Sequence, residues 1–274
     1  MAPESLRDRL YTTEAIVLSR LDYGEADRIL TLYTPTRGKL SAIAKGARKP
    51  KSRSGPHLDF LARCSLHLAR GRDLDVVTHA ETVERHNGLY ADIDAFSYGS
   101  HMAEIVRHLT QDRQENRAVY DLLARSLTLL NDGVDPWPVT RHFELVALSA
   151  LGYHPELYSC LNCRQPVEAV PNVFSARMGG VVCQRCRSVD PGVMPISVNG
   201  QKYLRTLDRA GLAAAARLRP SEGERMEIEG VLSQYLRTVA ERDLASLTVL
   251  RSMQRGPQDA DSAQTAASLV PASD

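Results

Sequence analysis

Aromatic residues are scarce in this sequence: they make up 5% of its 274 residues and include a single tryptophan. No apolar run approaches the roughly 18 residues that cross a bilayer, and the first twenty residues contain no apolar segment of a signal peptide. Phosphate-loop, zincin, serine-hydrolase and dinucleotide-binding motifs are also missing from it. We therefore expect a cytoplasmic protein, and no motif indicates an enzyme.

The net charge is nearly zero, because 34 basic residues stand against 33 acidic ones and leave a formal charge of +1. The charges are unevenly distributed, however. Residues 28–72 hold eleven basic residues and one acidic residue, so this window carries +10 and the rest of the chain −9. The densest run, residues 45–53, has five basic residues in nine. Such a run cannot bury its charges, so they face either solvent or a polyanion.

The N-terminal part of the chain has the pattern of short β-strands. Apolar residues alternate or form short β-branched runs between turn residues, a pattern that predicts strands at 13–21, 28–34, 39–45, 64–69 and 74–83. Five short strands without a long helix between them favour an OB-type barrel over residues 1–83. An SH3-like barrel has a compatible strand count and stays open as an alternative.

Beyond residue 84 the apolar spacing becomes helical. It predicts a helical domain over residues 84–253, with helices at 92–109, 119–130, 139–151, 198–207 and 221–240. The last of these begins with Ser221 and Glu224 in the spacing of a capping box. Residues 254–274 lack periodicity and are predicted to be a disordered tail. The expected fold class is therefore α+β and multidomain: an OB-type barrel, then helices with a cysteine module inserted.

Four of the five cysteines form two CxxC pairs separated by 19 residues. Two such turns supply four thiolates to one cation, so the spacing predicts a tetrahedral site for one Zn²⁺ within residues 158–190. Four thiolates leave no open coordination position, which indicates a structural metal. Reduced thiols or a redox pair are the alternative, and His154 is a possible replacement ligand. Cys64 stands alone on a predicted strand and is expected to be buried. The predicted ligands are Cys160, Cys163, Cys183 and Cys186.

OB folds bind single-stranded nucleic acid by combining a basic groove with aromatic side chains on which bases stack. The aromatic residues nearest the basic run are Tyr23, Tyr33 and Phe60, each of which is also a candidate for the core. A small acidic cluster at 22–27 could hold Mg²⁺ in a nuclease, although such turns are usually solvated or ion-paired.

Several segments together closely resemble the RecO family of bacterial DNA repair proteins. They are residues 14–18, 22–34, 38–53 and 70–74, followed by the cysteine module, so the resemblance covers most of the chain except the tail. It implies an OB domain, a helical domain and a zinc module. It also implies a nucleoid-associated mediator of the RecFOR pathway that binds single- and double-stranded DNA and anneals complementary strands. With RecR, such a mediator helps RecA to load onto DNA coated by single-strand binding protein.

The resemblance also implies which side chains contact DNA phosphates: Arg37, Lys39, Lys45, Arg48, Lys49, Lys51 and Arg53. Two other functions fit the sequence. One is a protein-docking adaptor whose DNA contact is made by a partner, and the other is a metal-dependent nuclease.

Overall fold

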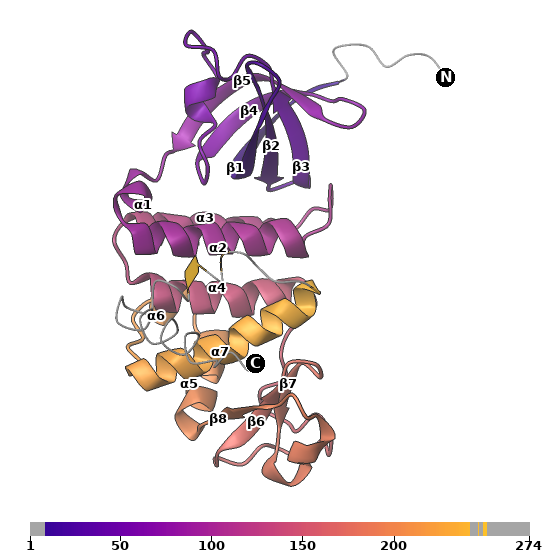
Figure 1. Ribbon diagram of the computed structural model, residues 1–274, viewed down its shortest axis with the longest axis vertical. Helices are drawn as coiled ribbons and strands as arrows, with labels where there is room; N and C mark the ends of the chain where they lie inside the picture. The colour runs from indigo at the N-terminus through magenta and orange to yellow at the C-terminus, as the bar shows by residue number, and fades with distance from the viewer. Residues whose placement is uncertain (1–8, 242–245, 247–248, 251–274) are drawn as a thin grey trace, which may run out of the picture.

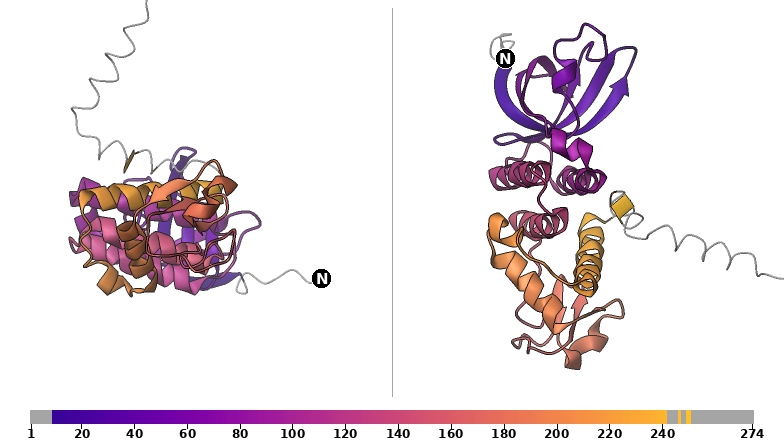
Figure 2. Two further views of the ribbon diagram at one scale, coloured as in Figure 1. Left: turned by 90° about the horizontal axis from the view of Figure 1, so that it is seen from below. Right: turned by 90° about the vertical axis from the view of Figure 1, so that its left-hand side faces the viewer.

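The computed structural model describes residues 9–241, 246, 249 and 250; the predicted tail at 254–274 lies outside this range. The described chain forms an elongated molecule with a barrel at one end, helices in the middle and a small sheet at the other end (Figures 1 and 2). Among the described residues no helix combines the length and apolarity that a membrane span requires.

The N-terminal strands form a closed ring in the order β1-β2-β3-β5-β4. Four of its pairings are antiparallel, and the fifth, between β3 and β5, is parallel. The seam that closes the ring, between β3 and β5, consists of only two parallel residue pairs, so the barrel is barely closed there. This order and the thin seam are those of an OB-like Greek-key barrel. The strands are β1 (Leu10–Tyr23), β2 (Asp27–Thr34), β3 (Gly38–Ala44), β4 (Arg63–Ala69) and β5 (Asp75–Glu84).

The barrel has its own core because alternate residues point inward. Along β3, Leu40, Ala42 and Ala44 are buried while the residues between them are partly exposed. Cys64 is fully buried, as predicted, and its thiol donates to the carbonyl of Ala15 at 3.6 Å. Burial raises the pKa of this thiol to about 12, so Cys64 contributes packing and not reactivity.

Seven helices follow the barrel in the described chain, and the five long ones lie where the sequence predicts them. The two short ones have too few residues to show a helical period. The helices are α1 (Asn87–Ala91), α2 (Ile93–Leu109), α3 (Arg117–Asn131), α4 (Pro136–Ala150), α5 (Val198–Arg209), α6 (Leu212–Ala215) and α7 (Glu222–Ala240). The capping box at the start of α7 is confirmed, since Ser221 and Glu224 each bond the other's backbone N–H.

Helix α4 is the centre of the helical region, and nearly all of its residues are buried. Two of these are charged. The Arg141 guanidinium lies 2.9 Å from the carboxylate of Glu144, and His101 on α2 contacts the same carboxylate at 2.7 Å. All three side chains are fully excluded from solvent. The opposite charges of Arg141 and Glu144 therefore neutralise each other inside the protein.

The barrel docks on α2 and α3 through buried apolar side chains such as Ile16 and Leu18, and through polar contacts with the 110–116 connection. Gly38 in the β2–β3 turn has a φ of +60°, and a Cβ there would lie 1.9 Å from the Gln114 carbonyl oxygen. Only glycine allows this approach. Arg113 reaches back to Asp75 on β5 at 3.0 Å. The barrel is therefore held against the helices by specific contacts.

Candidate metal centre and nucleic-acid interface

The two CxxC pairs come together at the end of the molecule opposite the barrel. Their four Sγ atoms all lie within 4.8 Å of one another, and those of Cys163 and Cys183 are 3.9 Å apart. A tetrahedron with metal–sulfur bonds of about 2.3 Å has edges of about 3.8 Å, so the cluster has the size of a thiolate metal site. The cysteines can hold a metal ion and leave it no open position.

Local structure orients each pair. Cys160 and Cys163 lie on a turn closed by the Arg164 N–H and the Cys160 carbonyl at 2.8 Å. Cys183 and Cys186 lie at the start of the 3₁₀ helix η2 (Gln184–Val189), just after the hairpin of β6 and β7, whose turn includes Gly179. The small sheet behind them consists of β6 (Asn172–Ser175), β7 (Gly180–Val182) and β8 (Met194–Ile196).

Within this cluster, backbone N–H groups favour the thiolate of Cys160. Burial acts to raise the pKa of Cys160, but the N–H groups of Cys163, Cys183 and Asn162 together lower it to about 6. His154 is not part of the cluster, because it lies on the surface and pairs with Asp208 at 2.7 Å.

The basic run 45–53 forms the first half of an ordered loop between β3 and β4. Its backbone is fixed by hydrogen bonds to the start of β2, such as Gly46 N–H to Asp27 at 2.7 Å and Arg48 N–H to the Ala26 carbonyl at 2.9 Å. Ala47 is buried and anchors the loop on the barrel core. The backbone is thus held in place while the cationic side chains stay outside.

A groove of about 460 Å³ lies between this loop and β5. Val77 and Thr78 of β5 form one side, and the only acidic residue in the lining is Asp27, whose carboxylate accepts the Gly46 N–H. Four exposed cations line the other side: Lys45, Lys49, Lys51 and Arg53. These four predicted residues are therefore brought together on one surface, which we call the basic groove.

Three other predicted phosphate contacts lie elsewhere. Arg48 points away from the groove and pairs with Asp22 at 3.3 Å. The Arg37 guanidinium stacks over the Tyr11 ring at 4.2 Å. Lys39 differs most from its expected role: its ammonium donates to the carbonyls of Arg107 and Thr110, both at 2.7 Å, at the end of α2. We leave Lys39 out of the DNA interface, because its charge serves the docking of the barrel.

The three aromatic candidates also separate. Tyr23 is exposed, whereas Tyr33 is fully buried and packs against Tyr120. Phe60 packs edge-on against Phe96 of α2 at 5.9 Å. Tyr33 is therefore a core residue, one of the two roles that the sequence allowed, and no base can reach its ring.

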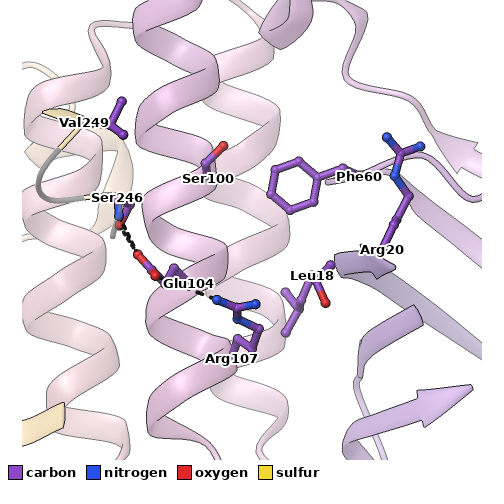
Figure 3. Close-up of a pocket in the computed structure, with 9 residues that line it drawn as sticks. Leu18, Arg20, Phe60, Ser100, Glu104, Arg107, Ser246 and Val249 are labelled. Carbon is purple, nitrogen blue, oxygen red and sulfur yellow. Dashed lines mark hydrogen bonds and ion pairs between the residues drawn. The ribbon is translucent and has the colours of Figure 1, made fainter. Parts of the chain in front are cut away.

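Phe60 lines a second hollow, at the seam between β1, α2 and residues near the end of the described chain (Figure 3). The charges there compensate one another: Arg107 lies 3.8 Å from Glu104, and Arg20 pairs with Asp59 at 2.6 Å. Ser246 donates to Glu104 as well. This hollow therefore lacks the free positive charge of the basic groove.

The acidic cluster at 22–27 does not gather as metal ligands would. Asp22 pairs with Arg28 and Arg48, and Asp27 holds the basic loop. Within the described residues the cysteine cluster is the one group that meets the geometry of a metal site. The arrangement gives the nuclease hypothesis no support.

Comparison with known proteins agrees with these observations. The model of the family "Recombination protein O N terminal" matches residues 8–86, and that of "Recombination protein O C terminal" matches residues 90–248. The chain is 38% identical over 250 residues to a protein named DNA repair protein RecO from Roseiflexus sp. (strain RS-1), covering 91% of this chain and 88% of that one.

Two further relatives with the same name are similar over a comparable length. The protein from Heliobacterium modesticaldum is 38% identical over 252 residues, 90% of this chain and 91% of its own. That from Dehalococcoides mccartyi (strain CBDB1) is 32% identical over 244 residues, 89% of this chain and 96% of its own. The two family models together cover the barrel and the helical region, and the chain is a member of the RecO family of DNA repair proteins.

Proposed function

We propose that this protein is a non-enzymatic recombination mediator that binds single- and double-stranded DNA in the basic groove and anneals complementary strands. With RecR, it would help RecA to load onto DNA coated by single-strand binding protein, in the cytoplasm at the nucleoid. The observation that carries the DNA-binding part is the basic groove. Four exposed cations there share one ordered wall, and no ion pair engages them among the residues that the structure describes.

The mechanism is electrostatic. Two strands that anneal must approach each other although their phosphates repel, and their base edges must stay free to pair. Cations that neutralise phosphates lower this repulsion without reading sequence. The ordered loop holds Lys45, Lys49, Lys51 and Arg53 before DNA arrives, so less conformational entropy is lost when the phosphates bind.

We further propose that the cysteine cluster holds one structural Zn²⁺. Four thiolates at tetrahedral spacing suit this ion and leave no position for water or substrate. The metal would hold the turn at Cys160–Cys163 against η2, and so stabilise the small sheet.

The groove is tested by charge reversal. Four phosphate contacts on a single strand correspond to a slope of log K against log salt of about −3. The variant Lys45→Glu/Lys49→Glu/Lys51→Glu/Arg53→Glu is expected to lose this slope and nearly all binding to an oligo(dT) probe. A matched control reverses four exposed cations of the helical region and should keep both, namely Arg125→Glu/Arg187→Glu/Lys202→Glu/Arg217→Glu.

Strand annealing with the same variants separates the mediator from the adaptor hypothesis. We expect the groove variant to fail on naked DNA as well as on DNA coated with single-strand binding protein. If it anneals naked DNA normally and fails only on coated DNA, the groove serves a protein partner and the DNA-binding proposal is wrong.

A further inference from the structure

The basic groove lacks the aromatic wall that single-strand binding usually requires. Base–aromatic stacking contributes much of the affinity of such grooves. Here Tyr33 is buried, Phe60 packs on α2, and no tyrosine, phenylalanine or tryptophan lines the groove. Flat rings are nevertheless present beside it, on the outer face of β4 and β5.

Two of these rings belong to His67 and His79, which are direct partners across the antiparallel β4–β5 pair. Their ring centroids are 5.5 Å apart and the planes are perpendicular. Both residues are exposed, and half of the His79 side chain is open to solvent. A perpendicular pair offers one flat ring face, on which a base can stack, and one ring edge with N–H groups that can meet a phosphate.

A β-bulge places His79 on this surface. Val77 and Ala80 point into the barrel, and the ladder pairs His67 with His79 but Leu68 with Val77. Thr78 is the extra residue, and both it and His79 are therefore exposed. In a regular strand His79 would share the inward face of Val77, so the bulge is what turns its imidazole outward.

The bulge also joins the histidine pair to the basic groove. Thr78 lines the groove and donates to the carbonyl of His67 at 3.0 Å. On the other side, the basic loop runs into the 3₁₀ helix η1 (Gly55–His57), where the Nδ1 of His57 accepts the Thr82 N–H at 3.1 Å. The loop cations and the imidazoles thus form one continuous strip.

The charged neighbours of the pair are few. Glu81, two residues along β5, lies 3.0 Å from the Nε2 of His79, and the hydrogen bond from His79 is the main cause that lowers the pKa of its carboxyl. His67 and His57 act on Glu81 in the same direction. Lys51 and Arg53 line the groove opposite Thr78. One carboxylate therefore faces three imidazoles.

We propose that His67 and His79 extend the Thr78 side of the groove, and that a base of single-stranded DNA stacks on their rings. This inference rests on the proposed function of the groove. It assigns to two histidines the stacking role for which the sequence had indicated aromatic residues.

The test uses the full-length protein with two double variants and an oligo(dT) probe that carries one 2-aminopurine. His67→Gln/His79→Gln removes both rings and is expected to weaken binding about tenfold, as the loss of one stacked base does. It should also lose most of the fluorescence change. His67→Tyr/His79→Tyr keeps flat rings, so it should retain both the affinity and the fluorescence change.

His154→Gln is the control, because this surface histidine lies outside the strip and pairs with Asp208. If the glutamine variant binds like the native protein while reversal of the loop charges abolishes binding, the inference fails and the proposed function stands. If neither variant affects binding, both are wrong.

Discussion

The barrel and the helical region differ in where their charged side chains lie: exposed on the barrel loop, but buried and paired at the centre of the helices. In the barrel, Lys45, Lys49, Lys51 and Arg53 lie on an ordered loop, exposed along one groove. In the helical region, Arg141 and Glu144 are fully buried and compensate each other next to His101. The exposed cations add little to folding and are available to a polyanion, whereas the buried pair is committed to the core. The difference separates charges that can serve function from charges that serve structure.

The largest expected effect comes from the cysteine cluster, which tests whether structural groups can be lost without loss of DNA binding. Cys160→Ser should abolish metal binding and unfold the small sheet, since binding to such sites is coupled to about 10 kcal/mol of folding free energy. Oligo(dT) binding by the barrel at the other end should persist. Metal content by mass spectrometry and limited proteolysis check the first part, and Cys64→Ser, outside the cluster, is the control. Loss of DNA binding in step with the metal would contradict the division.

Breaking the buried pair comes next in size. Arg141→Met leaves the Glu144 carboxylate buried without its cation, and we expect a loss of about 3–5 kcal/mol in the free energy of unfolding. Urea denaturation measures it. The double variant Arg141→Met/Glu144→Leu should recover most of this loss, because no uncompensated charge remains. Equal destabilisation in both variants would mean that packing and not charge dominates at this position.

Lys39 and Lys45 make a sharper comparison, because they lie six residues apart and have opposite environments. Lys39→Met removes hydrogen bonds to two carbonyls at the end of α2 and should cost about 1–3 kcal/mol of stability. It should leave DNA affinity nearly unchanged. Lys45→Met should do the reverse. A large loss of DNA affinity in Lys39→Met, with stability intact, would return this lysine to the interface.

The smallest expected effect is the pH dependence of barrel docking. Burial acts to raise the pKa of Asp75, but hydrogen bonds from Arg113, Tyr11 and the Gly71 N–H lower it overall. A lowered pKa means that the carboxylate stabilises the fold above its unfolded value of about 3.9 and loses this contribution as the pH falls through the folded value. Asp75→Asn should therefore weaken the dependence of the free energy of unfolding on pH below about pH 4. Urea denaturation at a series of pH values checks this, and the same pH dependence in the variant as in the native protein would contradict it.

Local patterns in the sequence predicted much of the fold. The alternation along β3 and the capping box at Ser221 depend on residues close together in the chain, and both are confirmed. The CxxC spacing predicted a metal site, and the structure brings the four sulfurs together. Helices α1 and α6 were missed because they are too short for a helical period. The β5 bulge was missed as well, since a bulge appears only when the partner strand is known.

The order of the residues along the chain, without any tertiary contact, set the presence of a basic region, two CxxC pairs and a barrel pattern. Which cations are free, however, was decided by the tertiary structure. Lys39 and Lys45 look alike in the sequence, but the carbonyls that bind Lys39 belong to residues about 70 positions away. The same holds for Tyr33, buried by α3, and for His79, turned outward by its neighbours on β4. The residue type determines what a side chain can bind. Whether a ligand can reach that side chain depends on the residues that pack against it in the tertiary structure.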